Sequence, residues 1–207
     1  MALSIKPNFA EVHANLGLSL QELGKLDEAI SHCYKALQIK PDLPEGHSNL
    51  GNILREVGRL DEAGASCHKA LAIKPNYAEA NNNLGDALQG LGKLDEAINS
   101  YHKALSIKPN YAEAYSNLGL ALQELGRLDE ALTHYFKAIK IKSDYAEAHN
   151  NLGLALIEQG KFDEAVASCQ RALALNTEFA EAYNNLGVVL KDCLLYTSDA
   201  ADDTPCV

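Results

Sequence analysis

Histidine and cysteine are the residue types in this sequence that most readily do chemistry, because they bind metals and act as bases or nucleophiles. Two adjacent pairs stand out, His32-Cys33 and Cys67-His68. Neighbouring residues on a helix point about 100° apart, so neither pair can readily chelate one ion. The sequence offers no orienting group for a Cys–His nucleophile and contains no GxxxxGKS/T, GxGxxG or HExxH motif. We therefore expect no catalytic, cofactor-binding or metal-binding residues and no enzymatic activity.

A row of asparagines is a stronger candidate for a binding function. An asparagine followed by Leu-Gly occurs six times at intervals of 34 residues, at Asn15, Asn49, Asn83, Asn117, Asn151 and Asn185. Each amide offers an acceptor and two donors, which match the C=O and N–H groups of an extended peptide. This asparagine row predicts a site that holds a polypeptide by its backbone, largely independently of its sequence. A structural role, in hydrogen bonds between adjacent helices, is the alternative.

Other polar residues extend the row. Asn82, Asn150, Asn52 and Asp86 lie beside it and complete the predicted peptide-binding set, whereas Leu18, Leu120 and Leu154 make other repeats more apolar. A glutamate also precedes each row asparagine by four residues, at Glu11, Glu45, Glu79, Glu113, Glu147 and Glu181. A carboxylate in the first turn of a helix is favoured by the helix dipole, which is sufficient to explain most of this second row.

The elements that must position these residues follow from a repeat of the whole chain. Leu20, Gly24, Ala29 and Ala36 each recur in phase with the asparagine row. In the unit 112–145, apolar residues at helical spacing form two stripes separated by Gly126, which predicts two helices. One such hairpin cannot bury both stripes, so the units must stack on their neighbours. The sequence therefore predicts an all-α solenoid of antiparallel helix hairpins.

These residues resemble the tetratricopeptide repeat (TPR) family, over residues 1 to about 191. The resemblance implies a right-handed superhelical solenoid of 34-residue repeats whose concave groove is lined by the first helix of each hairpin. It also places the asparagine row toward that groove, similar to the asparagine ladder of O-linked N-acetylglucosamine transferase-like proteins. TPR domains that clamp acidic chaperone tails need basic inner residues, and here only Arg55 and Lys191 are basic. We therefore expect an extended partner that is neutral to basic.

The repeat divides the chain into five complete hairpins and two partial ones. The complete repeats are 10–43, 44–77, 78–111, 112–145 and 146–179. Residues 1–9 are predicted to end the second helix of a truncated preceding repeat, and 180–192 to form the first helix of a truncated sixth. The repeat is lost at Cys193, and residues 193–203 resemble translated sequencing-adapter sequence. We expect 193–207 to be a non-native or disordered tail and the chain to be a fragment.

Repeat 44–77 is predicted to be the least stable complete repeat. Pro44, Gly46 and Gly64 replace residues that are apolar or helix-favouring in other repeats. A glycine inside a helix costs about 1 kcal/mol relative to alanine, and lost side-chain contacts add to that cost.

Composition restricts the class of partner. The formal net charge of −10 argues against nucleic acid, and no apolar run is long enough to cross a membrane. The five cysteines have no CxxC spacing, which favours reduced thiols and a cytoplasmic location. We expect a protein–protein interaction scaffold. The alternative is a substrate-recruiting module of a larger multidomain enzyme such as a glycosyltransferase, and weak self-association through uncapped ends is a third possibility.

Overall fold

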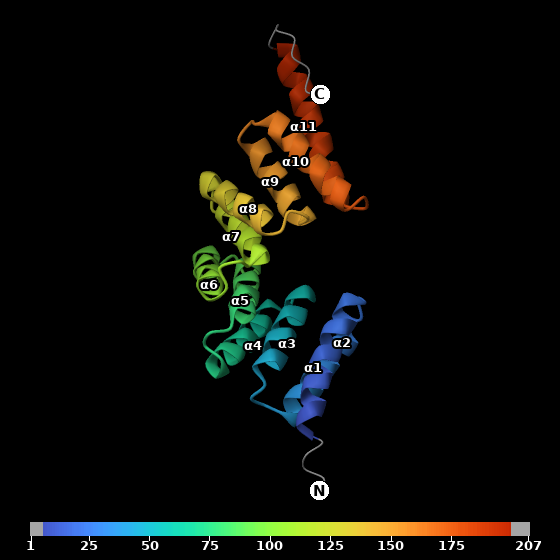
Figure 1. The fold of residues 1–207 in the computed structure, drawn as a ribbon, viewed down its shortest axis with the longest axis vertical. Helices are drawn as coiled ribbons and strands as arrows, with labels where there is room; N and C mark the ends of the chain where they lie inside the picture. Colours follow the sequence, from blue (N-terminus) through green and yellow to red (C-terminus); the bar gives the residue numbers. More distant parts are fainter. Residues whose placement is uncertain (1–5, 200–207) are drawn as a thin grey trace. The chain divides into compact units, whose positions relative to one another are not determined.

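The computed structural model describes residues 6–199, with the side chains of residues 9–191. The part of the chain so described is helical without strands and falls into two units, divided between Pro109 and Asn110 (Figure 1). Unit 1 contains α1 (Lys6–Glu22), α2 (Leu26–Ile39), α3 (Pro44–Glu56), α4 (Leu60–Ile73), α5 (Ala78–Gly90) and α6 (Leu94–Ile107). Unit 2 contains α7 (Ala112–Glu124), α8 (Leu128–Ile141), α9 (Ala146–Glu158), α10 (Phe162–Leu175) and α11 (Ala180–Asp199).

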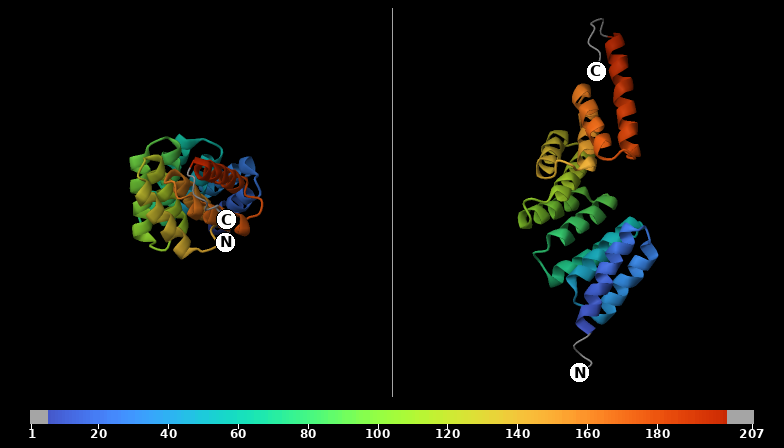
Figure 2. Two further views of the ribbon diagram at one scale, coloured as in Figure 1. Left: turned by 90° about the horizontal axis from the view of Figure 1, so that it is seen from above. Right: turned by 45° about the vertical axis from the view of Figure 1, so that its right-hand side comes forward.

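Packing within each unit joins only near neighbours in the sequence. In unit 1 the pairs α1–α2, α3–α4 and α5–α6 form hairpins, and α3 packs on α2 as α5 packs on α4 (Figure 2). In unit 2 the hairpins are α7–α8 and α9–α10, with α11 packed on α10. The first helices of consecutive hairpins also touch, as in α1–α3 and α7–α9. This arrangement confirms the predicted fold class, an all-α solenoid of antiparallel helix hairpins.

A glycine with positive φ makes the turn inside each hairpin. Gly58 has φ +76° and Gly126 φ +77°, a left-handed conformation that side chains with a Cβ rarely adopt. The backbone N–H that follows bonds back to the end of the first helix, as in Arg59 N to Leu54 O at 2.8 Å. These bonds satisfy carbonyls that the end of a helix leaves open, so the chain reverses without exposing unpaired groups.

Close contact between the two helices of a hairpin requires a second glycine. A Cβ built on Gly85 would lie 2.5 Å from Tyr101 Cε1, and one on Gly51 would lie 2.5 Å from Cys67 Sγ. Tyr101 and Cys67 are fully buried. Cys67 therefore acts as a small core residue that fits against the glycine of the first helix.

Both ends of the helical array differ from the predicted boundaries. Helix α1 begins at Lys6, so residues 6–9 are its first turn and not the end of a preceding second helix. Pro7 is compatible with this turn because the first N–H groups of a helix have no partner inside it. Helix α11 continues past Asp192 to Asp199, so the predicted boundary at 192 is not where this helix ends. The rest of the predicted tail, 200–207, and residues 1–5 lie outside the described residues.

Candidate peptide-binding face

Row asparagines join each first helix to the first helix of the preceding hairpin. Four of them donate through Nδ2 to the residue 35 positions earlier: Asn49 to Ala14 O (3.2 Å), Asn83 to Ser48 O (3.3 Å) and Oγ (3.2 Å), Asn151 to Ser116 Oγ (3.4 Å), and Asn185 to Asn150 Oδ1 (2.9 Å). Of the other two, Asn15 is exposed on α1 and Asn117 is partly buried on α7. The amide hydrogens of the four asparagines therefore serve the stacking of the repeats.

The amide oxygens of these four asparagines do not take part in these bonds between helices. Among the described residues, nothing donates a hydrogen bond to the Oδ1 of Asn49, Asn83, Asn151 or Asn185, and all four side chains are partly exposed. An amide oxygen has two lone pairs and accepts readily from a backbone N–H. In these four asparagines the amide donors therefore hold the stack together, and the amide acceptors are not used by it.

Two members of the predicted set lie inside the stack and not on its surface. Asn82 is 5% exposed and Asn150 is 6% exposed. Asn150 accepts the bond from Asn185, and Asn82 Nδ2 lies 3.5 Å from Asp86 Oδ2. Both side chains are therefore nearly covered in this structure, and their direct contact with a peptide stays a prediction.

A polar network occupies the inner positions of unit 1, the third and sixth residues after each row asparagine. Asn52 donates to Gln21 Oε1 at 3.3 Å and accepts from Arg55 at 3.3 Å. Arg55 Nε lies 4.0 Å from Asp86 Oδ2, close enough for charge attraction but too far for a hydrogen bond. Asp86, with 17% of its side chain exposed, also accepts from the buried Tyr101 hydroxyl at 2.8 Å. The two predicted residues Asn52 and Asp86 are therefore linked to each other through Arg55.

The inner positions of unit 2 are mostly apolar. Leu120, Leu154 and Ile157 are partly buried, and Val188 is exposed. Gln123 is polar, and it accepts a hydrogen bond from the Tyr135 hydroxyl at 2.8 Å. This hydroxyl has a raised pKa, chiefly because it is buried, so it stays a donor throughout the physiological range. The same face of the hairpin thus has a different chemistry in each unit.

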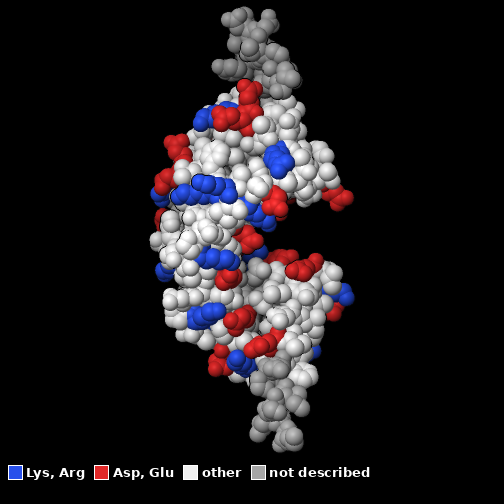
Figure 3. Space-filling view, in the orientation of Figure 1, with Lys and Arg blue, Asp and Glu red and all other residues white. Residues whose placement is uncertain are grey.

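The glutamate row forms ion pairs within its own hairpins. In unit 1, Lys108 Nζ lies 3.0 Å from Glu79 and Lys74 Nζ lies 3.5 Å from Glu45, so the end of each second helix is tied to the start of its first. Burial raises the pKa of Glu79, but the hydrogen bond from Lys108, a backbone hydrogen bond and the charges of Lys108 and Lys74 together outweigh this effect, and the net shift is downward. In Figure 3, acidic and basic side chains alternate on the visible face of each unit and neither sign forms a separate patch.

The thiols are buried core groups. Cys33, Cys67 and Cys169 are fully buried and unpaired, and burial raises the pKa of Cys33 and of Cys67 to about 12. Such thiols are protonated at neutral pH and are poor nucleophiles. Across the described residues, no group of three or more His, Cys, Asp and Glu is placed to hold a metal ion. Nor does any helix in that part of the chain combine the length and apolar character needed to cross a membrane.

Comparison with known families agrees with this architecture. The family model described as TPR repeat matches residues 51–92, 90–126 and 124–159, and that described as tetratricopeptide repeat matches 10–43 and 146–179. The chain belongs to the tetratricopeptide repeat family. The ranges 10–43 and 146–179 coincide with two of the five predicted TPR repeats. No curated protein sequence matches the chain.

Several solved TPR structures are similar to it. TTC0263, a thermophilic TPR protein of Thermus thermophilus, has a TM-score of 0.78 and 24% identity, covering 88% of this chain and 99% of its own. MamA has a TM-score of 0.63 and 31% identity, covering 80% and 96%. YrrB, described as a TPR protein with an unusual peptide-binding site, has a TM-score of 0.60 and 22% identity, covering 83% and 89%. The first and third comparisons concern the TPR fold alone, because their identity is low.

Sequence reasoning missed some TPR residues that the structure brings together. Gln21, Gln89 and Tyr101 complete the polar network of unit 1, although they are far apart in the sequence. The 34-residue spacing offered a signal for Gln21 and Gln89, since both lie six residues after a row asparagine. No comparable signal pointed to Tyr101, whose hydroxyl reaches the inner face from the second helix of its hairpin.

Proposed function

We propose that this TPR chain is a non-catalytic interaction scaffold that binds an extended polypeptide on the first-helix face of its units. The observation that carries the proposal is the Oδ1 that Asn49, Asn83, Asn151 and Asn185 leave without a donor among the described residues. An extended peptide presents its N–H groups at regular intervals, so a row of acceptors can hold it with little dependence on its side chains. The description of YrrB as having a peptide-binding site lends support from a protein of the same fold.

The charge of the scaffold favours a neutral to basic partner. The chain has a formal net charge of −10, and Asp86 adds a carboxylate to the inner positions of unit 1. A protein of this charge attracts basic segments and repels acidic ones over a distance set by the salt concentration. The unpaired, buried thiols fit a reducing compartment, and we place the protein in the cytoplasm on that basis.

The direct test uses a peptide selected on the full chain from a random library. Single backbone N-methyl groups, which remove one N–H each, should weaken binding of this peptide by about five- to tenfold at the positions that face the row, as expected for a lost hydrogen bond. Equal affinity for every N-methylated peptide would contradict the proposal.

A set of protein variants gives an independent test. Replacing Asn83, Asn117 and Asn151 together by alanine should abolish binding while the far-UV circular dichroism stays helical. The matched control replaces Asn76, Asn99 and Asn110, which are exposed and lie outside the first helices, by alanine. We expect this control to bind like the original chain. Retained affinity in the first variant would refute the role of the row.

A further inference from the structure

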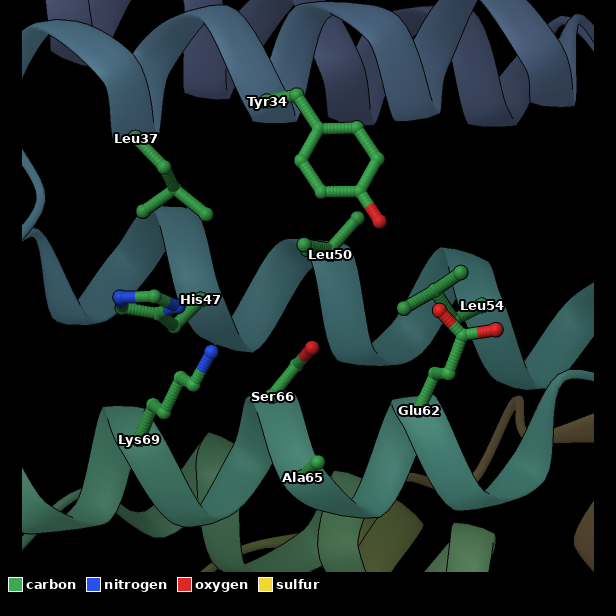
Figure 4. A pocket seen from close by; sticks show the side chains of 9 residues that line it. All are labelled: Tyr34, Leu37, His47, Leu50, Leu54, Glu62, Ala65, Ser66 and Lys69. Atoms are coloured by element: carbon green, nitrogen blue, oxygen red, sulfur yellow. The ribbon is translucent and has the colours of Figure 1, made fainter.

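A cavity of about 300 Å³ lies among α2, α3 and α4 in unit 1, away from the asparagine row. Leu37, Leu50 and Leu54 form its apolar walls, and His47, Ser66 and Lys69 bring polar groups into it. In Figure 4, Tyr34 and Leu37 reach down from α2, while Lys69 extends from α4 toward the His47 ring. The cavity thus has apolar walls with a few convergent polar atoms, the usual composition of a small-ligand site.

His47 lines this cavity and has an unused hydrogen-bond acceptor in its wall. Its side chain is only 9% exposed, and its Nε2 lies 2.8 Å from the carbonyl oxygen of Pro41. A carbonyl can only accept, so Nε2 must carry the hydrogen and Nδ1 is left as the acceptor of a neutral imidazole. Within the described residues, Nδ1 is buried and has no partner. Buried acceptors are nearly always paired, so this atom points to a missing donor.

Equivalent positions in other hairpins show what stands in the place of that donor. In the first hairpin, His13 Nδ1 lies 2.8 Å from His32 Nδ1, with ring centroids 5.0 Å apart. His32 occupies the position that Ser66 occupies in the second hairpin, and His13 the position of His47. In the second hairpin Ser66 stands where the first hairpin has the His32 ring, so His47 has no ring partner among the described residues and the space of that ring is unfilled.

The fourth hairpin fills the same place with another ring. There the Tyr115 and His134 rings stack, with centroids 5.8 Å apart and planes 22° apart. Lys137 Nζ lies 5.7 Å from the centroid of the Tyr115 ring. Lys69 occupies the position of Lys137 in the second hairpin. The second hairpin therefore retains the lysine and one ring of this arrangement and lacks the other ring.

We propose that the cavity binds a neutral, planar heteroaromatic ring that carries one N–H, of which indole is the simplest example. The ring would donate its N–H to His47 Nδ1 and lie against the three leucines. The ammonium group of Lys69 would lie near its π face, in a cation–π interaction. A cationic ligand is disfavoured by the same lysine. The nearby carboxylate of Glu62 does not compensate, because Arg59 holds it through two bonds of 2.7 and 2.6 Å.

The indole can come from a free small molecule or from a tryptophan side chain of a docked protein. The chain itself contains no tryptophan, so the fluorescence of either probe can be followed without an indole background. We would titrate the full chain into indole and, separately, into N-acetyl-tryptophanamide. Saturable binding with a blue-shifted emission is expected for indole. Binding of the second probe as well would assign the site to a tryptophan side chain, and its exclusion would assign the site to a free molecule.

Two controls separate this pocket from non-specific binding of an aromatic compound. 1-Methylindole has the same ring but no N–H, and we expect it to bind about tenfold more weakly because one hydrogen bond is lost. Ser66→His copies the His13–His32 pair and should abolish binding by filling the cavity. Its matched control is Ser168→His in the fifth hairpin, where His149 Nε2 lies 3.1 Å from Ser143 O but the side chain is partly exposed, and this change should leave indole binding unchanged.

A further variant covers the case in which Ser66→His fails to fold. His47→Phe keeps an aromatic ring, as the fourth hairpin does with Tyr115, and removes the Nδ1 acceptor without supplying another. We expect it to weaken indole binding at least about tenfold with no loss of helicity. The proposal is overturned if indole does not bind saturably, if 1-methylindole binds as tightly as indole, or if a folded variant at Ser66 or His47 binds like the original chain.

Discussion

The inner positions of the two units differ although the hairpins that carry them are built alike. Unit 1 places Asn52, Arg55 and Asp86 there, and unit 2 places Leu120, Leu154 and Ile157. The core of both units uses the same pairing, in which a glycine on the first helix faces a buried tyrosine on the second, as in Gly85–Tyr101 and Gly119–Tyr135. The core therefore leaves the inner face free to vary, and the two units present different chemistry on one scaffold.

The largest expected effect tests whether the cores are equivalent. A Cβ on Gly85 or Gly119 would lie 2.5 or 2.6 Å from a tyrosine ring atom, so each Gly→Ala change should force the hairpin apart. We expect each to cost about 2 kcal/mol, the overpacking penalty less the gain in helix propensity. Hydrogen exchange resolved by segment would measure the loss in each unit.

The matched control for these two changes is Gly187→Ala. A Cβ at this position meets nothing within 4 Å, so the substitution should be neutral or should stabilise α11 by up to about 1 kcal/mol. Loss of protection in one unit but not in the other, for Gly85→Ala and Gly119→Ala, would show that the two cores are not equivalent.

The next prediction exchanges the chemistry of the inner positions. Asp86→Leu gives unit 1 the residue type of unit 2 and removes the acceptor of the Tyr101 hydroxyl as well as the charge that faces Arg55. We expect a loss of about 1 to 2 kcal/mol in unit 1, limited because the Tyr101 hydroxyl can still donate to Gln89 at 2.8 Å. Urea denaturation would measure this loss, and hydrogen exchange resolved by segment would assign it to unit 1.

Asp86→Asn serves as the control, since it keeps an acceptor for Tyr101 and removes only the charge. We expect it to retain more than half of the stability that Asp86→Leu loses. An equal loss in both variants would mean that the charge, and not the hydrogen bond, stabilises this face of unit 1.

A smaller effect compares the asparagine row in the two units. Asn83 donates to two oxygens of Ser48 at 3.2 and 3.3 Å, whereas Asn151 reaches one oxygen of Ser116 at 3.4 Å. Asn83→Ala should therefore cost about 1 kcal/mol and Asn151→Ala about 0.5 kcal/mol. Melting curves of the two variants under the same conditions would rank them. A larger loss of stability for Asn151→Ala than for Asn83→Ala would mean that these hydrogen bonds do not determine the stability of the stack.

The smallest effect at neutral pH concerns the thiols of unit 1. Because burial raises the pKa of Cys33 and Cys67 to about 12 from an ordinary value near 9, the folded chain keeps protons that the unfolded chain releases. Stability should be unaffected below about pH 9 and should fall as the pH rises from about 9 to 12. Thiol reagents should modify these residues only as fast as the protein opens. For this measurement Cys193 and Cys206 would be replaced by serine.

The sequence was sufficient to predict the hairpins and their order, because both depend on local periodicity. It was less reliable for repeat 44–77. Pro44 is the first residue of α3, where proline is well tolerated, and a Cβ at Gly46 would lie 3.0 Å from Leu37 Cδ2. Only Gly64, whose Cβ would have room, leaves a gap of the kind expected. That this repeat exchanges its amide hydrogens fastest stays a prediction.

The sequence predicted where the asparagine row lies on the first helices, but not which atoms of each amide form hydrogen bonds within the protein. The spacing of Asn49 and Asn83 placed them on one face and left open a role in hydrogen bonds between helices, but it did not show that their amide hydrogens bond to the preceding first helix. Burial of Asn150 was hidden for the same reason, since it depends on how closely α9 and α11 pack. Contacts between repeats are set by three-dimensional packing, which periodicity alone does not specify.

The row bonds also constrain how such a gene can change in length. Each bond joins an asparagine to the residue 35 positions earlier, one residue before its counterpart in the preceding hairpin. Duplication or excision of one whole 34-residue unit would bring together equivalent partners again. An insertion shorter than one repeat, placed in a first helix before its asparagine, would move that asparagine away from its acceptor in the preceding hairpin. Recombination between repeats is therefore the change in length that this protein tolerates best.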